Sequence, residues 1–437
     1  MTESIPLRSA RAGIGDDFSV WALAVALRPL QVLMAAPSLL FLAMLAAMLL
    51  RNQKVDFYEI DRVAFALLVI AVVGRVMVQR QRLFVVERIT LPMFGLTILV
   101  LTSVMGQPFS TETWSLLASK FIVPFALFHL AGVVFTGERE FRQFEIFALL
   151  VLAYLSFIAI AFLVGARALI FPRFILDESL GFHPDRARGP FLQAVANGVS
   201  LNVLGLVALH AYKRGSVRGL KILLLLASVP VAILATMTRA VWLSFAGSVV
   251  ALVLYSKNRA LQRAAVGLAL LAVIGFAILS SHELRGALSD RLEERGPVEF
   301  REAVYAGSWQ MFLERPLTGW GFHQMPADLP RYVSEYKDKI LYPHNTYLEL
   351  LVEHGVVGLA LYLWLMLEIW RLGRGAIPAG EKNGFLDPLF HRLWPILLVV
   401  YWVNAALVVM SYQFVNALLF TLAGMLSAQR RRAEACQ

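Results

Sequence analysis

The sequence has little charge and almost no cysteine. Only 16% of its 437 residues are Asp, Glu, Lys or Arg, and its single cysteine is Cys436. Soluble domains carry about 25% charged residues, so the low charge argues against a soluble protein. One cysteine cannot form an intramolecular disulfide, which excludes a disulfide framework. The hydrophobic share of 59% and the mean hydropathy of +0.67 indicate an integral membrane protein instead.

Motifs for metal ions and nucleotides are also missing. The segments expected outside the membrane contain no DxD-type pair and no HExxH, and the cytoplasmic side has no P-loop. Two pairs of adjacent acids, at 177–178 and 293–294, are poorly arranged to hold one ion. We therefore expect no metal, no cofactor and no ATP-driven chemistry.

Long apolar runs dominate the rest of the chain. They are about 17–22 residues long and do not alternate, which suits helices that cross a hydrocarbon core of about 30 Å. The sequence predicts an all-α integral membrane protein with about 12 transmembrane helices. These predicted helices cover residues 34–50, 63–78, 89–105, 121–136, 146–165, 192–212, 220–235, 239–255, 264–281, 346–370, 393–410 and 412–428.

Lysine and arginine predict the orientation of the chain. Alternate connections, beginning with the N-terminal segment, carry far more of these residues than the short connections between them, which marks the cytoplasmic side. This bias accounts for the net charge of +10 without nucleic-acid binding, and it places both termini in the cytoplasm. The predicted organisation is a cytoplasmic N-terminal segment (1–17), nine transmembrane helices (within 18–281) with an external segment (166–191), a large, partly helical external loop (282–345), three transmembrane helices (within 346–428) and a basic cytoplasmic tail (429–437).

The stretch 342–358, YPHNTYLELLVEHGVVG, ends the large external loop and begins a helix. Asn345 is a suitable N-cap for a helix that starts near Thr346. We therefore expect His344 at the membrane–water boundary, where a histidine suits the role of a general base at neutral pH. A lone histidine at a helix entrance is also commonly a hydrogen-bonded structural residue.

Three arginines are predicted on the same side as His344. Arg239 lies in the short turn TMTRA, which has no acid nearby in the sequence, and Arg186 and Arg188 lie in HPDRARGPF. Guanidinium groups match phosphate oxygens in bidentate fashion, so these residues predict a pocket for a lipid-linked diphosphate. The alternative is that they contact lipid headgroups.

Other polar residues are weaker candidates. Acids inside membrane helices are functional suspects by default, which applies to Glu349 and Glu353. Arg75 equally suits snorkelling to the cytoplasmic surface. His323 and Trp320 in the large loop could contact substrate, although a tryptophan there is at least as suited to packing.

Four motifs occur in a fixed order between residues 186 and 358. They are RARGPFLQAVANG, TRAVW, R-x7-W-x6-P-L-x-G-W-G from Arg301 to Gly321, and PHNTYLELLVEHGVVG. In this order they resemble the O-antigen ligase and O-antigen polymerase superfamily, which includes exopolysaccharide polymerases. The resemblance covers roughly residues 186–410. It departs from the family's Asn-Pro-Asn pattern before the next helix, where this chain keeps only Asn197.

The resemblance implies an enzyme of the bacterial inner membrane whose large loop and active site face the periplasm. It implies inverting, metal-independent glycosyl transfer from a polyprenyl-diphosphate carrier such as undecaprenyl diphosphate. The family's essential histidine maps to His344, one essential arginine maps to Arg239, and the other maps to Arg186 or Arg188. Candidate substrate contacts are Asn345, Asn197, His323 and Trp320.

Several activities remain open at this point. The favoured one is ligation of O-antigen to lipid A–core in lipopolysaccharide biosynthesis. A polymerase would use the same groups with a lipid-linked glycan as acceptor, and a protein O-glycosyltransferase would differ in acceptor. A transporter or flippase for a lipid-linked glycan also fits 12 helices, but such proteins place polar groups near the midplane and often contain inverted repeats. We find no repeat here.

Overall fold

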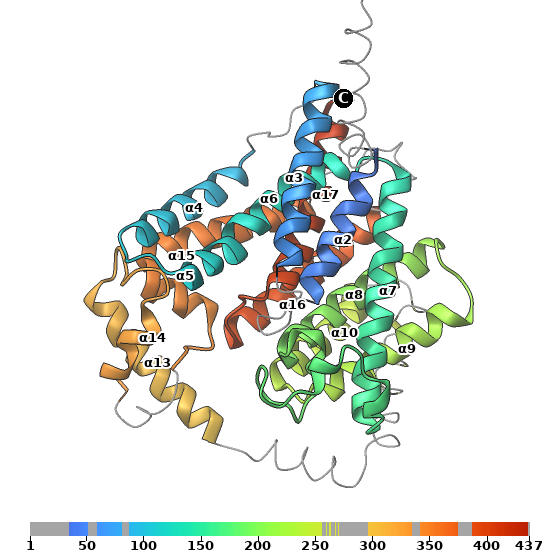
Figure 1. Cartoon of the computed structure of the whole chain (residues 1–437). Coiled ribbons are helices and arrows are strands. Elements are labelled where there is room, and N and C mark those ends of the chain that lie inside the picture. The colour runs from blue at the N-terminus through green and yellow to red at the C-terminus, as the bar shows by residue number, and fades with distance from the viewer. Residues whose placement is uncertain are drawn as a thin grey trace, which may run out of the picture.

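The computed structural model describes residues 35–50, 59–80, 87–255, 296–333, 341–374 and 387–435, with a few single positions between 259 and 270 (Figure 1). All the regular elements in these ranges are helices, which confirms the predicted all-α class. Most of the predicted helix 264–281, residues 282–295 and 334–340 of the large loop, and Cys436 lie outside the described residues.

The helices follow one another along the whole described chain. In order they are α2 (Pro37–Leu49), α3 (Ile60–Gln79), α4 (Thr90–Met105), α5 (Thr111–Leu117), the π-helical turn η1 (Ala118–Ile122), α6 (Val123–Val134), α7 (Glu138–Leu163), α8 (Ala194–Arg214), α9 (Leu220–Ala235), α10 (Arg239–Tyr255), α13 (Gly296–Glu314), α14 (Met325–Asp328), α15 (Thr346–Leu372), α16 (Pro388–Leu407) and α17 (Gln413–Ala435). Short 3-10 turns, η2 (Arg167–Leu169), η3 (Arg173–Leu176) and η4 (Gly189–Phe191), lie between α7 and α8, and η5 (Leu329–Arg331) follows α14.

Five helical stretches in the described residues are long and apolar enough to cross a membrane. They are Thr111–Val134, Glu138–Leu163, Ala194–Arg214, Thr346–Leu372 and Pro388–Leu407. Four shorter apolar helices, α2, α4, α9 and most of α10, accompany them. Together they indicate a multi-pass membrane protein, while the count of 12 transmembrane helices stays a prediction.

The helix predicted over residues 121–136 is longer at its start. In the structure it begins at Thr111 and continues through α5, η1 and α6. Ser110 starts it, because its extended backbone lets its Oγ accept the N–H of Thr113 at 3.4 Å. Lys120 therefore lies inside a helix that is long enough to span a membrane.

Helix α17 forms the centre of the bundle. Every residue from 414 to 429 is buried, as expected for a helix with neighbours on all sides. It packs most extensively on α6, and Gly424 allows the close approach, since a Cβ there would lie 2.0 Å from the carbonyl oxygen of Phe128. In Figure 1 the C-terminal end of α17 lies at the top, whereas α13 and α14 lie in the lower half of the view.

Helix α15 is broken in its first half, at Gly355, whose φ of 63° is non-helical. The segment PLTGWG, residues 316–321, fills the break. Trp320 N–H donates to the carbonyl of Val352 at 2.8 Å, and Gly321 N–H donates to that of Glu353 at 2.9 Å. Val356 N–H donates in turn to the carbonyl of the first residue of PLTGWG at 2.8 Å. Two sequence motifs therefore pair through their backbones, so the PLTGWG segment in the middle of the large loop is bonded into α15.

Replacing Gly355 by alanine should destabilise this pairing. A Cβ at this position would meet the carbonyl oxygen of Leu317 at 2.2 Å, and the backbone conformation, with φ 63° and ψ −165°, is essentially restricted to glycine and costs about 1–3 kcal/mol for other residues. We expect a loss of at least about 2 kcal/mol, measured as a lower thermal unfolding midpoint of the detergent-solubilised protein. Gly247→Ala is the matched control, because nothing lies within 4 Å of a Cβ there. Equal midpoints for the two variants would contradict the prediction.

Candidate functional site

His344 lies immediately before α15, as the sequence predicts. Asn345 caps this helix, since its Oδ1 accepts hydrogen bonds from the N–H groups of Tyr347 at 3.0 Å and Leu348 at 3.1 Å. These bonds satisfy two of the N–H groups that every helix start leaves without an intrahelical partner. The φ of His344 is 45°, in the left-handed region, so the chain turns sharply just before the helix.

Helix α13 covers the imidazole of His344. The ring centroid of Phe300 lies 6.5 Å from that of His344, and the O–H of Tyr305 donates to the His344 carbonyl at 3.4 Å. Burial and the positive charge of Arg301 lower the pKa of His344 below its ordinary value, because both disfavour the imidazolium form. At neutral pH the ring is therefore uncharged and has a nitrogen that can accept a proton.

The first turn of α15 is bonded to the connection between α16 and α17. Thr346 Oγ1 donates to the carbonyl of Val408 at 2.9 Å and accepts the N–H of Met410 at 2.9 Å. The same connection leads into Phe414, whose ring lies 5.6 Å from that of Phe191 in η4. The entry of α15 is thus tied to the segment that carries two of the predicted arginines.

The two predicted arginine regions also meet. The N–H of Ala187 donates to the carbonyl of Ala235 at 3.1 Å, which joins the external segment to the end of α9. Arg239 follows four residues later, as the exposed first residue of α10. Near the start of α10, Ser244 Oγ accepts from Asn404 Nδ2 at 2.9 Å, near the end of α16. His344, Arg239 and the external arginines therefore lie around one end of the bundle.

The two arginines of the external segment differ in their surroundings. Arg188 is 1% exposed, and its guanidinium donates to the carbonyl of Ile175 at 2.9 and 3.1 Å and to the carbonyls of Asp177 and Leu180. Backbone carbonyls therefore occupy its Nε and both Nη atoms. Arg188 holds the η3 turn against the start of η4 and has little capacity left for a ligand.

The guanidinium of Arg186 has a hydrogen-bond donor that is not used. Its Nε is buried and has no hydrogen-bond partner, and its nearest acid is Asp185, at 3.7 Å, with a side chain that is 64% exposed. An ion pair with so exposed a partner is weak. A buried guanidinium nitrogen without a partner is costly, so of the two arginines Arg186 is the one suited to receive an anion.

Residues 222–363 match the family model described as O-antigen ligase. The similarity to this family covers that stretch, which is less than half of the chain. The matched stretch runs from α9 into α15 and includes Arg239 and His344, whereas Arg186 precedes it. The match confirms the resemblance to the O-antigen ligase and polymerase superfamily. A search of curated proteins finds no match to the chain.

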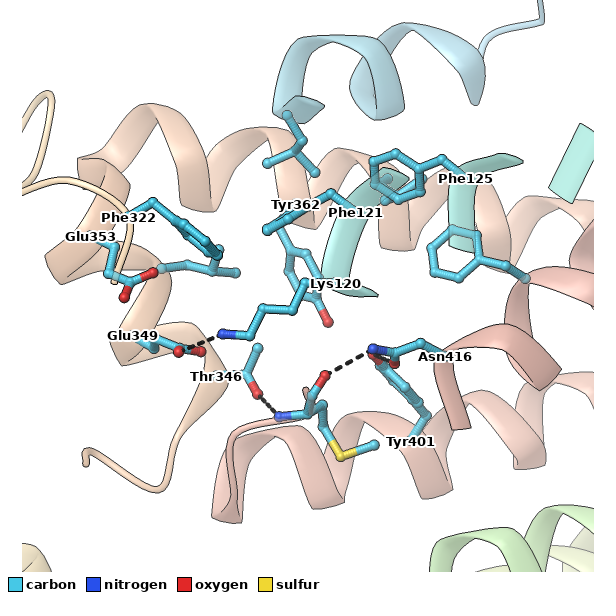
Figure 2. A pocket seen from close by; sticks show the side chains of 15 residues that line it. Lys120, Phe121, Phe125, Phe322, Thr346, Glu349, Glu353, Tyr362, Tyr401 and Asn416 are labelled. Carbon is cyan, nitrogen blue, oxygen red and sulfur yellow. Dashed lines mark hydrogen bonds and ion pairs between the residues drawn. The ribbon is translucent and has the colours of Figure 1, made fainter. Parts of the chain in front are cut away.

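Beside the first turns of α15, residues of the matched stretch line part of a small cavity of about 50 Å³. Lys120 of η1 reaches into it and forms an ion pair with Glu349, with Nζ and Oε1 2.8 Å apart (Figure 2). Glu353, one turn further along α15, also lines the cavity, together with Tyr362. A buried lysine beside two acids is a feature that the sequence interpretation missed. The signal for it was Ser110, an N-cap residue ten positions before Lys120.

The remaining predicted contacts have structural partners. Asn197 is fully buried and its Nδ2 donates to the carbonyl of Ala187 at 2.8 Å, which supports the external segment. The indole N–H of Trp320 donates to Met311 at 2.7 Å, and the guanidinium of Arg315 lies 4.3 Å from its ring centroid. These contacts favour the packing alternative for Trp320.

His323 lies between α15 and α5. Its N–H donates to Glu353 Oε1 at 2.9 Å, and its Nε2 lies 3.8 Å from Glu112 Oε1 in α5. It therefore belongs to the surroundings of the Lys120 cavity. Among the residues that the structure describes, no group of three or more His, Cys, Asp or Glu side chains could hold a metal ion.

Proposed function

We propose that this protein is a membrane-embedded inverting glycosyltransferase, which moves a glycan from a polyprenyl-diphosphate carrier to an acceptor hydroxyl. The observation that carries the proposal is a chain of contacts between neighbouring residues, which brings the half-buried His344 to the same end of the helical bundle as Arg239 and Arg186. The O-antigen ligase family match over residues 222–363 supports the reaction type.

The arginines would stabilise the leaving diphosphate. Arg186 offers a buried N–H without a hydrogen-bond partner, and Arg239 stands at the start of α10, where helix N–H groups and the helix dipole favour anions. Cations that are already in place need no reorganisation as charge develops on the diphosphate. Removing one such group typically lowers kcat by about 10²–10³-fold.

His344 would act as the general base. The acceptor oxygen forms a bond to the anomeric carbon while the bond from that carbon to the diphosphate oxygen breaks. The imidazole accepts the proton that the hydroxyl gives up, and the diphosphate leaves with the bonding electron pair. Attack opposite the leaving group inverts the anomeric centre. This chemistry is balanced without a metal ion or a cofactor.

The favoured acceptor is lipid A–core, which makes the protein an O-antigen ligase. In this proposal the active site faces the periplasm from the inner membrane, and both termini lie in the cytoplasm. The second candidate is a polymerase of the same superfamily, whose acceptor is another lipid-linked glycan. The family match supports a ligase- or polymerase-type function without separating the two. In this proposal both would use the same donor, with the same roles for His344 and Arg239.

Deleting the gene in a host that makes lipopolysaccharide should distinguish these activities on a glycolipid gel. For a ligase we expect all long O-chains to disappear from lipid A–core while lipid-linked polymer accumulates, because the final transfer is blocked. The wild-type gene should restore the long chains, and the His344→Ala gene should not.

Other patterns on the gel would correct the proposal. A single repeat left on the core would identify an O-antigen polymerase, and an unchanged lipopolysaccharide with a missing secreted polymer would identify an exopolysaccharide polymerase. No change in any glycan would contradict a glycosyltransferase and favour a transporter.

A further inference from the structure

A buried ion pair joins the π-helical turn η1 to the first turn of α15. The side chains of Lys120 and Glu349 are only 15% and 11% exposed, and the ammonium lies 2.8 Å from the carboxylate (Figure 2). Pairs of this kind give orientation more than stability, because desolvation of both charges offsets their attraction. Such a contact is therefore sensitive to the removal of either partner, which leaves the other charge buried and alone.

The sequence around Lys120 explains why its side chain reaches α15. Pro124 lies at the second position of α6, four residues after Lys120. A proline inside a helix lacks an N–H, and its ring clashes with the carbonyl four residues earlier, which here is that of Lys120. The π-helical turn Ala118–Ile122 widens the helix at this place and relieves the clash. Lys120 therefore projects from a locally widened turn.

Glu349 transmits this contact to His344 through one turn of backbone. The N–H of Glu349 donates to the carbonyl of Asn345 at 2.9 Å, and Asn345 directly follows His344. Thr346, in the same turn, forms hydrogen bonds with the connection between α16 and α17. The entry turn of α15 is thus held at two points, one of which is the ion pair with Lys120.

We propose that Lys120 is a positioning residue, which fixes the entry turn of α15 through Glu349 and so places the imidazole of His344 for proton transfer. This inference rests on the proposed function. Lys120 does not contact the reacting atoms in it. A displacement of about 1 Å at a reacting group can cost about 10²-fold in rate, so a loosened entry turn is sufficient to reduce turnover strongly.

The test is an exchange of the two charges in the full-length protein, reconstituted with a lipid-linked glycan donor and its acceptor. Lys120→Glu and Glu349→Lys should each lower kcat about 10–100-fold, while the KM for the donor changes less than about threefold, because the diphosphate site is intact. The double variant, which restores opposite charges at the two positions, should return kcat to within about fivefold of wild type.

The control lies at the opposite end of α15. Arg371 pairs with Glu368 on the same helix at 2.7 Å, far along the chain from His344. Arg371→Met should leave kcat unchanged. If neither charge reversal gives folded protein, Lys120→Arg and Lys120→Met are compared instead. We expect arginine to keep kcat within about fivefold and methionine to lower it at least about tenfold.

Three results would overturn the inference. They are a wild-type kcat in Lys120→Glu, equal kcat values in Lys120→Arg and Lys120→Met, and a rise in the donor KM that the double variant does not reverse. The last would mean that Lys120 itself contacts substrate. His344→Ala is measured in parallel. If it is inactive while Lys120→Glu is fully active, this inference alone fails, whereas full activity of His344→Ala refutes the proposed base.

Discussion

Replacing His344 by asparagine should lower glycan transfer by about 10²–10⁴-fold, the usual contribution of a positioned general base. Asparagine tolerates the left-handed backbone that His344 adopts, with φ at 45°, but its amide cannot take up a proton at neutral pH. His344→Ala should give the same loss with some added backbone strain. The measurement is the rate of glycan attachment by the purified protein, with its thermal unfolding recorded beside it.

A histidine in a similar backbone conformation provides the control. His183 is exposed, lies in the external segment and has a φ of 54°, so His183→Asn should leave transfer unchanged. The pH profile of the wild type is a second check. Because the pKa of His344 is lowered, its neutral form persists as the pH falls past about 6.5. Transfer should therefore decline only below that pH, and near wild-type transfer by His344→Asn would refute the assignment.

Substitutions of the two external arginines should have different effects, one on glycan transfer and the other on stability. Arg186→Gln should lower transfer by about 10²–10³-fold, as for loss of one preorganised group at a developing charge, and should leave unfolding unchanged. Arg188→Gln should lower the free energy of unfolding by about 3 kcal/mol or more. The substitution leaves buried carbonyl oxygens without a hydrogen-bond donor, and each costs about 1–3 kcal/mol when unsatisfied. Thermal unfolding and glycan transfer of both variants test this split.

One pair of results would contradict this assignment of Arg186 to the diphosphate and Arg188 to the fold. If Arg188→Gln unfolds like the wild type and loses transfer, while Arg186→Gln keeps transfer, then Arg188 is the diphosphate ligand and its contacts with the η3 turn contribute little. Arg142→Gln serves as the matched control, since Arg142 is an exposed residue in the first turns of α7, on the predicted cytoplasmic side. It should change neither quantity.

The sequence was sufficient to predict features that depend on local chemistry. Apolar runs predicted the helices, and Asn345 predicted the start of α15, because an N-cap acts within three residues. The Lys and Arg bias of the connections predicted His344 and Arg239 on the same side, and the contacts of the described residues bring them to the same end of the bundle. The roles of these two residues in catalysis stay predictions.

Other features depend on partners far along the chain, which spacing does not reveal. Arg186 and Arg188 look alike in the sequence, and only the carbonyls around the η3 turn separate them. Lys120 directly precedes the predicted helix 121–136, so the sequence interpretation leaves it in a connection. Its partner Glu349 is 229 positions away, so neither residue alone signals the pair.

The break in α15 limits how the chain can vary in length. Residues 316–321 supply two N–H donors and one carbonyl acceptor to positions 352–356. These three backbone hydrogen bonds fix the register of the two segments. Side chains such as Leu317, which is 67% exposed, are free to change without disturbing this register. A single inserted or deleted residue in either segment would shift the register and leave the exposed ends of both half-helices without partners. The fixed spacing of PLTGWG is therefore a requirement of backbone geometry, set independently of any glycan that the protein handles.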